Sequence, residues 1–171
     1  PNNPSGKYFD SETLSSISEV LLSNKNIYIS SDDIYEHIHW HNEKFHNILN
    51  VSPDLKERTI ILNGVSKAYS MTGWRIGYAA GNSEIIKKMK TLQSQSTSCA
   101  SSISQAAACA ALSSECKELP AMRAEYKKRH DFVVKQLNQI EGVLCKETDG
   151  TFYVFPSFKK YIQNSELSND N

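Results

Sequence analysis

Apolar and polar residues alternate along the chain in blocks that predict helices and strands in turn. After Asp10 or Ser11, either of which can cap a helix, apolar residues recur at helical spacing and predict a helix with one inward face. That face is predicted to carry Leu14, Ile17, Val20 and Leu21. Residues 27–31 and 59–63 are short β-rich runs that deliver polar or reactive residues at their carboxyl ends. This order is typical of an open α/β sheet, in which ligands bind outside those ends.

The rest of the chain continues the same alternation. In order, it predicts a strand at 76–80, a helix capped by Ser83, a serine-rich loop at 94–102, a tightly packed alanine-rich helix at 103–112, and a long helix from Pro120 to about 139. The inward side of the long helix is predicted to carry Met122, Tyr126, Val133 and Leu137. Residues 143–146 and 151–155 look like strands of a second, smaller unit.

Charge and hydropathy narrow the kind of partner. The 19 basic and 19 acidic residues balance, so no general attraction to nucleic acid or to an anionic membrane is expected. No apolar run approaches the roughly 20 residues needed to cross a bilayer, and the first residues lack a basic and then apolar leader. The sequence therefore predicts a cytoplasmic protein. The turn-like residues 1–6 and the polar residues 163–171 suggest a piece of a longer chain.

Four cysteines and a group of histidines are the residues of this chain that could bind a transition metal. Cys99, Cys109, Cys116 and Cys145 form no CxxC pair, and we interpret them as small, buried, reduced thiols. Residues 37, 39 and 41 are histidines that would share one face of a strand, a spacing that can bind zinc. No cysteine or further carboxylate joins them at a convincing spacing, so we expect no metal site.

The string GVSKAYSMTGWRIG at residues 64–77 carries the most specific chemistry. Lys67 follows a predicted strand among small residues, which permit a planar cofactor to approach the backbone. A lysine kept off the surface can lose its proton and act as an amine nucleophile. Arg75, eight positions on, can bind a phosphate with its planar guanidinium group. A lone lysine in a loop is usually only a solvated charge, so the whole string is what favours a functional site.

This string resembles, position for position, the cofactor-attachment signature of class I and II aminotransferases, which use pyridoxal 5'-phosphate. Residues 71–75 (MTGWR), 93–97 (QSQST) and 150–153 (GTFY) look most like the bacterial aspartate aminotransferase branch. The resemblance runs from residue 1 to about 158. It implies that Lys67 binds the cofactor through a Schiff base and that Arg75 anchors its phosphate. Many relatives carry a serine that contacts the phosphate three residues before the lysine, where this chain has Gly64.

Two further motifs match the same family. The segment SDDIYE at 31–36 is similar to its Asp-Glu-Ile-Tyr motif, and a carboxylate beside a pyridine nitrogen keeps that nitrogen protonated. Asp32 suits that task, and the Tyr35 phenol suits a hydrogen bond to the ring's 3-hydroxyl oxygen. Without the lysine string, a helix or turn cap would explain this aspartate equally well. The NPSG turn at 3–6 looks like the family's Asn-Pro-Thr-Gly turn, which implies that Asn3 contacts the same oxygen.

The resemblance also implies a fold and a domain division. The expected fold is part of the three-layer α/β/α large domain of pyridoxal-phosphate transferases, followed by the start of a small α+β domain. Residues 1–125 would be the central part of the cofactor-binding large domain. Residues 126–171 would be the interdomain helix and the beginning of the small C-terminal domain. The family's active sites lie at a dimer interface, so a homodimer is expected.

The implied function is ping-pong transamination between an amino acid and a 2-oxo acid, with Lys67, Asp32 and Tyr35 as catalytic residues. Aspartate with 2-oxoglutarate is the leading substrate pair by branch similarity. Aromatic amino acids or prephenate are the runners-up, and a non-catalytic domain of a regulator that senses pyridoxal phosphate is the alternative from another class. A structural α/β domain with an incidental lysine is the third interpretation. This segment alone is expected to bind the cofactor weakly and to transaminate poorly.

Overall fold

The chain forms two compact units in the computed structural model, which describes residues 1–114 and 116–163. The first unit comprises residues 1–8, 38–42 and 120 onward, and the second comprises residues 9–37 and 43–119. Each unit is a separate body with its own contacts. Of the predicted polar stretch at 163–171, residues 164–171 lie outside the described residues.

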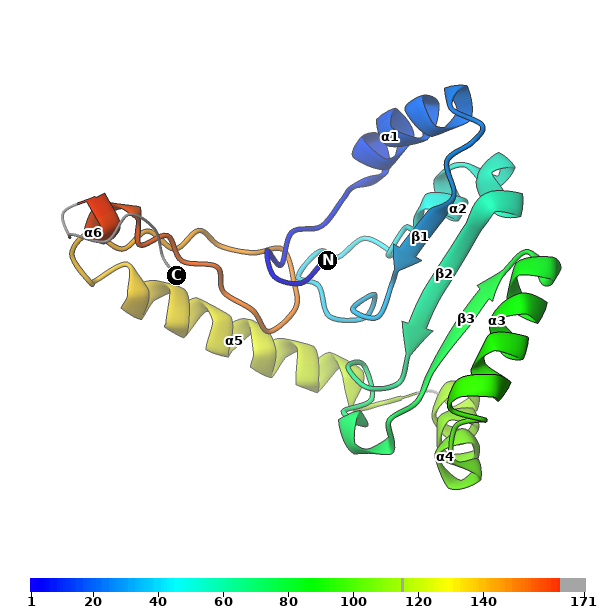
Figure 1. Cartoon of the computed structure of the whole chain (residues 1–171). Coiled ribbons are helices and arrows are strands. Elements are labelled where there is room, and N and C mark those ends of the chain that lie inside the picture. Colours follow the sequence, from blue (N-terminus) through cyan, green and yellow to red (C-terminus); the bar gives the residue numbers. More distant parts are fainter. Residues whose placement is uncertain (115, 164–171) are drawn as a thin grey trace. The chain divides into compact units, whose positions relative to one another are not determined.

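A three-stranded mixed sheet forms the centre of the second unit (Figure 1). Strand β1 (Ile29–Asp32) runs parallel to β2 (Thr59–Gly64), and β2 pairs antiparallel with β3 (Gly77–Gly81). The three strands predicted from the β-rich runs are therefore confirmed, each within two residues of its expected bounds. The α/β fold class is confirmed as well.

Helix α1 (Ser11–Ser23) begins at Asp10, whose Oδ1 accepts a hydrogen bond from the Thr13 amide at 2.8 Å. Its buried positions are Leu14 and Ser18, whose hydroxyl donates to the Leu14 carbonyl at 2.7 Å and is thereby satisfied. The predicted inward face is therefore wrong in part, because Ile17 and Val20 are exposed. The buried stripe follows the actual packing partners of the helix and is narrower than its apolar pattern.

The main apolar core of the second unit lies between α1, α2 (Ile48–Val51) and the 3-10 helix η1 (Pro53–Arg58). It consists of Leu14, Ile48 and Leu55, with Leu21, Ile29, Leu49 and Val51 packed against it. The Arg58 guanidinium donates to the carbonyls of Asn24 at 2.8 Å and Ile27 at 2.9 Å, beyond the end of α1. These bonds satisfy carbonyl groups that have no partner within the helix.

Two more helices follow β3 in the second unit. Helix α3 (Ser83–Ser96) runs alongside β3 (Figure 1), and α4 (Ser102–Ser113) follows it. The predicted cap Ser83 is wrong, because Asn82 caps α3 through its Oδ1, which accepts from the Glu84 amide at 2.9 Å. The serine-rich loop is shorter than predicted, since α3 continues to Ser96. Helix α4 is not tightly packed, because only Ser104 and Ala108 are buried.

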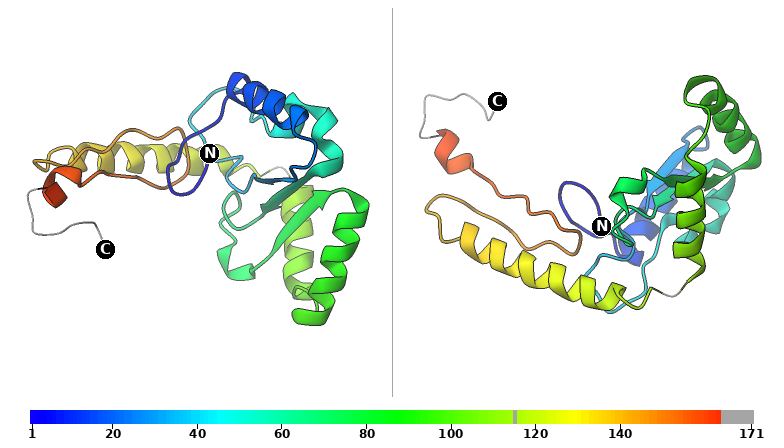
Figure 2. Two further views of the ribbon diagram at one scale, coloured as in Figure 1. Left: turned by 45° about the horizontal axis from the view of Figure 1, so that its top comes forward. Right: turned by 90° about the horizontal axis from the view of Figure 1, so that it is seen from below.

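The first unit contains the long helix α5 (Leu119–Leu137) and the short helix α6 (Lys159–Gln163) (Figure 2). Pro120 lies in the first turn of α5, as predicted. The buried residues of this helix are His130 and Val134, whereas Val133 is exposed, so the predicted inward face is wrong in part. In the described part of the chain, no helix is long and apolar enough to cross a membrane.

The predicted strands at 143–146 and 151–155 are wrong. The first segment has a single bridge, between Leu144 and Ser157, and the second has none, since the bridge of His39 is to Gly150, just before it, and Thr151 has a φ of 66°. A side chain satisfies the backbone where a neighbouring strand would: the Asn138 amide donates to the Cys145 carbonyl and accepts from its N–H, both at 2.8 Å.

Cysteine burial also differs from the prediction. Cys145 is buried, Cys116 is half-buried, and Cys99 and Cys109 are exposed, while all four are free thiols. The alanine-rich surroundings of Cys109 indicated a packed helix, but the exposed side of α4 carries this cysteine. Apolar neighbours in sequence therefore did not establish burial.

Candidate active site

The carboxyl ends of β1 and β2 lie next to each other and bring two predicted site segments together. Asp32, the last residue of β1, pairs in register with Leu62, and the Asp33 amide donates to the Leu62 carbonyl at 2.9 Å. Because the two strands are parallel, the turns that follow them emerge at the same edge of the sheet. One turn carries Tyr35 and the other carries Lys67.

Lys67 and Tyr35 are close in space. The Lys67 ammonium nitrogen lies 5.9 Å from the centre of the Tyr35 ring, within the range of a cation–π contact. Tyr35 is buried, and Lys67 is half-buried between the buried residues Val65 and Ala68. The burial of these two neighbours anchors the turn that carries the lysine.

Only one of the two adjacent aspartates is available to a ligand. The Asp33 carboxylate is buried and accepts from the Ser31 hydroxyl at 2.7 Å and the Asn47 amide at 2.9 Å. Asp32 is exposed, and its Oδ1 accepts a longer bond of 3.3 Å from the Ile34 amide. Asp33 therefore fixes the turn, while Asp32 offers its carboxylate at the edge of the sheet.

Arg75 lies in the turn that leads into β3. The turn contains the 3-10 helix η2 (Thr72–Trp74), and Arg75 adopts the left-handed conformation with a φ of 50°. Its Nη1 donates to the Thr72 carbonyl at 2.9 Å, and the side chain is exposed. Since Gly77 at the start of β3 pairs with Gly64 at the end of β2, this turn leaves and returns at the edge that carries Lys67.

Gly64 occupies the position at which the family resemblance implied a serine. A Cβ atom at this position would lie 3.1 Å from the Ile76 carbonyl oxygen and 3.2 Å from the Gly77 Cα, closer than most side chains approach backbone. A side chain here would require the paired backbone at the start of β3 to shift by a few tenths of an ångström. Because glycine has no hydroxyl group, this position cannot contact a phosphate through one.

Asn3 belongs to the first unit, unlike the other four predicted site residues. It is exposed in a turn closed by the Gly6 amide, which donates to the Asn2 carbonyl at 2.8 Å. The Gly6 carbonyl in turn accepts from the amides of Asp149 at 3.0 Å and Gly150 at 3.1 Å. The structure thus shows how the turn is held, and the cofactor contact of Asn3 stays a prediction.

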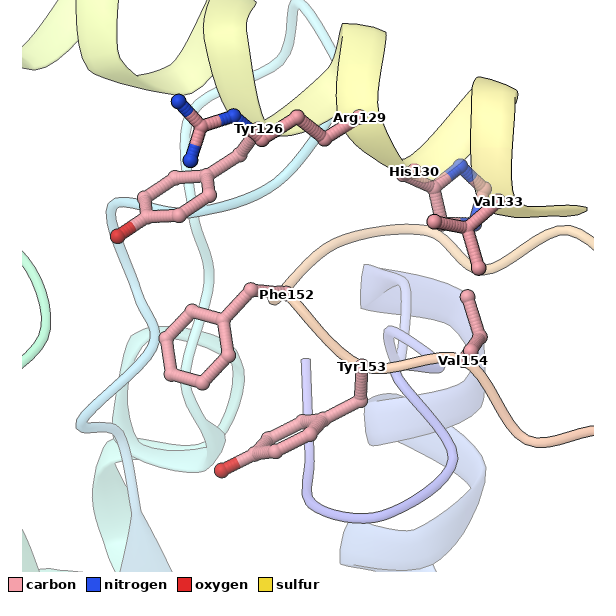
Figure 3. A pocket seen from close by; sticks show the side chains of 7 residues that line it. All are labelled: Tyr126, Arg129, His130, Val133, Phe152, Tyr153 and Val154. Carbon is pink, nitrogen blue, oxygen red and sulfur yellow. The ribbon is translucent and has the colours of Figure 1, made fainter.

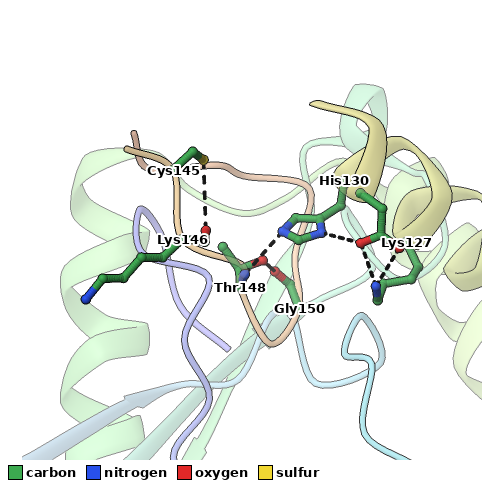
Figure 4. A network of polar contacts seen from close by, with 7 residues as sticks. Lys127, His130, Cys145, Lys146, Thr148 and Gly150 are labelled. Carbon is green, nitrogen blue, oxygen red and sulfur yellow. Dashed lines mark hydrogen bonds and ion pairs between the residues drawn. The ribbon is translucent and has the colours of Figure 1, made fainter. Parts of the chain in front are cut away.

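Sequence reasoning did not single out His130, a buried histidine at the centre of a polar network in the first unit (Figure 4). Its Nε2 lies 3.2 Å from the Thr148 amide, which donates to it, and its Nδ1 lies 3.0 Å from Asp131 Oδ1. Lys127 donates to both Asp131 oxygens at 2.5 and 2.6 Å. Since Nε2 accepts a hydrogen bond, Nδ1 carries the proton and donates to the carboxylate.

An open pocket of about 350 Å³ lies beside this network (Figure 3). Its lining comprises Tyr126, Arg129, His130, Val133, Phe152, Tyr153 and Val154. The Tyr126 and Phe152 rings lie 5.6 Å apart, and those of Phe152 and Tyr153 lie 4.8 Å apart. Arg129 is paired with Glu125 through a 2.9 Å hydrogen bond. The pocket is therefore mainly aromatic and apolar, with its cation already compensated.

The alternating histidines do not share one face of a strand. His37 lies in a turn of the second unit with its ring 6.3 Å from that of Tyr69. His39 and His41 lie in the first unit, where both pack against the Tyr8 ring. In residues 1–114 and 116–163, no three His, Cys, Asp or Glu side chains form a group that could hold a metal ion.

Lys67, Tyr35, Asp32 and Arg75 therefore belong to segments that begin or end at one edge of the sheet, and the structure brings Lys67 and Tyr35 close together. A family model described as aminotransferase class I and II matches residues 1–170, and the chain belongs to this family. The aspartate/prephenate aminotransferase of Nitrosomonas europaea is 46% identical over 162 residues, which cover 95% of this chain and 41% of that protein.

Solved structures of the family share the fold. The crystal structure of the Rhizobium meliloti aspartate aminotransferase matches with a TM-score of 0.88 at 45% identity, covering 92% of this chain and 39% of that one. The aromatic aminotransferase from Pyrococcus horikoshii matches with a TM-score of 0.83 at 35% identity, covering 91% and 42% of the two chains. The chain thus spans about two-fifths of the length of the relatives it matches.

Proposed function

We propose that the full-length protein is a pyridoxal-phosphate-dependent aminotransferase that uses Lys67 to bind the cofactor and works by a ping-pong mechanism. The observation that carries this proposal is the approach of the Lys67 amine to Tyr35, with Asp32 at the end of the adjacent parallel strand. Family membership supports it independently. When bound, the cofactor supplies an aldehyde for amine exchange and a ring that accepts electrons.

The donor groups fit this cofactor. The primary amine of Lys67 can form a Schiff base with an aldehyde, and the exposed Asp32 carboxylate can accept a hydrogen bond from a protonated ring nitrogen. The Tyr35 hydroxyl can donate to the ring's 3-hydroxyl oxygen, and a contact of the Asn3 amide with the cofactor stays a prediction. The Arg75 guanidinium can bind the phosphate in place of the Thr72 carbonyl.

These residues divide the work of proton transfer and positioning. With the cofactor and an amino acid bound, the Lys67 amine would move a proton away from the substrate's α-carbon. The Asp32 carboxylate favours the charged state of the ring nitrogen, while Arg75 retains the phosphate. Val65 and Ala68, both buried, keep the lysine's turn in place through this cycle.

Aspartate and 2-oxoglutarate are the proposed substrates. The relatives' names support an acidic amino acid, since those of Nitrosomonas europaea and Rhizobium meliloti are called aspartate/prephenate and aspartate aminotransferases. Prephenate is the second candidate, because the former name includes it. A homodimer, a cytoplasmic location and the division into domains at residues 125 and 126 remain predictions.

A substrate panel on the full-length protein tests the proposal. With pyridoxal phosphate bound, aspartate should change the cofactor absorbance in a half-reaction, and 2-oxoglutarate should restore it. Lys67→Ala should abolish turnover, whereas the matched variant Lys88→Ala, at an exposed position on α3, should keep it. A cofactor band with no response to any amino acid would favour the non-catalytic sensor. Full turnover by Lys67→Ala would refute the proposal.

A further inference from the structure

A side-chain hydrogen bond joins the turn that carries Tyr35 to the end of β2, the strand that leads into the turn of Lys67. The Asn63 Nδ2 donates to Glu36 Oε1 at 2.7 Å. Glu36 directly follows Tyr35, and Asn63 lies four residues before Lys67 at the end of β2. The bond therefore connects the carboxyl ends of the two parallel strands, next to the candidate site residues Tyr35 and Lys67.

The Asn63 amide has only one orientation that satisfies its surroundings. Its Oδ1 accepts from the Gly64 amide at 2.7 Å, so its NH₂ group is the part directed to Glu36. The Glu36 backbone is also fixed, because its N–H donates to the Asp33 carbonyl at 2.9 Å. Glu36 is thus restrained by its turn and Asn63 by its strand, so little freedom is lost in forming the bond.

The carboxylate of Glu36 is partly buried and affects its neighbours. Its side chain is 29% exposed, and its Oε1 lies 3.5 Å from His37 Nε2. Burial first, and the Glu36 charge among the further causes, raise the pKa of Tyr69 and of Tyr78 above the ordinary value of 10.0. A hydrogen bond to an ionised carboxylate in such surroundings is stronger than a neutral one at the surface.

We propose that Glu36 and Asn63 are positioning residues that set the separation between Tyr35 and Lys67. This inference rests on the proposed function, because it concerns the geometry of the same site. Neither residue needs to touch the cofactor. Their bond adds a side-chain link to the ladder between β1 and β2 and to the ring contact of His37 with Tyr69. Small errors in the placement of reacting groups cost much more in rate than in binding.

The chain offers a matched control for this bond. Asn82 Nδ2 donates to Glu57 Oε2, also at 2.7 Å and also in the second unit. Glu57 precedes β2 and Asn82 follows β3, so this second Asn–Glu pair lies at the opposite end of the strands. Glu57→Ala removes the same kind of bond without touching the turns of the candidate site.

The experiment compares full-length proteins carrying Glu36→Ala, Asn63→Ser, Glu36→Gln and Glu57→Ala. For each, the dissociation constant of pyridoxal phosphate, the pH midpoint of the Lys67-dependent absorption band and kcat are measured. Glu36→Ala and Asn63→Ser should shift the pH midpoint, weaken cofactor binding roughly 3- to 10-fold and lower kcat about 10- to 100-fold. Glu36→Gln retains an acceptor oxygen and should restore most of each value.

The controls separate the possible failures. Glu57→Ala should match the wild-type protein in all three measurements, and a Glu36→Ala protein that behaves like it would overturn the inference. If Glu36→Ala does not fold, Asn63→Ser carries the same test from the other side of the bond. If the wild-type protein itself forms no absorption band that depends on Lys67, both the proposed function and this inference are wrong. If that band forms and only Glu36→Ala behaves like Glu57→Ala, the inference alone is wrong.

Discussion

Gly150→Ala should destabilise the first unit, because a methyl group at this position has no space. An added Cβ would lie 2.3 Å from the Ile38 carbonyl oxygen, 2.7 Å from Pro1 Cγ and 2.8 Å from the His39 Cα. Two of these atoms belong to backbone, which cannot move aside as a flexible side chain can. Ile38 is also fully buried, so its carbonyl has no open space into which to move.

The expected cost follows from two effects. Ordinary contact begins at 3.4 Å, so the methyl group and the carbonyl must separate by about 1 Å. The Ile38 carbonyl also accepts from the Thr151 amide at 2.8 Å, and this bond would be strained or lost at about 0.5–1.5 kcal/mol. Overpacking of a closed site adds about 1–3 kcal/mol. Together they predict a loss of about 2–4 kcal/mol in the free energy of unfolding.

Urea denaturation followed by Trp40 fluorescence measures this loss. Trp40 donates its backbone N–H to the Asp149 carbonyl at 2.9 Å and thus reports on the affected turn. The chain has two tryptophans, so Trp74→Phe leaves Trp40 as the only one. The midpoint should fall by about 1–2 M urea. Gly73→Ala is the matched control, since a Cβ there meets nothing within 4 Å. Equal midpoints for the two alanine variants would refute the reasoning.

Two further predictions concern titrating groups of the first unit. The hydrogen bond from Lys127 is the first of several causes that lower the pKa of Asp131 below its ordinary 3.8. The contribution of Asp131 to stability is therefore full above pH 3.8 and is lost as the pH falls through the lowered pKa. In urea denaturation, Asp131→Asn should cost about 0.3–0.5 kcal/mol at pH 7 and nothing near pH 2; a cost that grows on acidification would contradict this. Burial raises the pKa of the Cys145 thiol above 9.0. With a thiol reagent at pH 8, exposed Cys109 should react first and Cys145 only on unfolding, and equal rates would show that Cys145 is accessible.

The parts of the fold with strong local signals could be predicted from the sequence. The runs at 27–31 and 59–63 became β1 and β2, and Asp10 capped α1, because these features depend on neighbouring residues. The reactive residues at the strand ends were predictable for the same reason. Once β1 and β2 pair in parallel, the turns that follow them lie side by side, and Lys67 is therefore close to Tyr35.

The parts that depend on distant residues could not be predicted. Exposure of Ile17 and Val20 depends on what packs against α1, which periodicity does not reveal. The segment near Cys145 forms one bridge and no strand, because the Asn138 side chain satisfies the backbone of the next residue. The bond between Glu36 and Asn63 joins residues 27 positions apart, and neither residue type signals a partner in sequence.

The central claim is a covalent bond between Lys67 and pyridoxal phosphate. Incubation of the full-length protein with the cofactor, reduction with borohydride, digestion and mass spectrometry would locate it directly. The account predicts that the peptide containing Lys67 gains the mass of a reduced pyridoxyl phosphate group and that aspartate, added before reduction, prevents the gain. Modification spread over exposed lysines such as Lys88, with none at Lys67, would contradict the account.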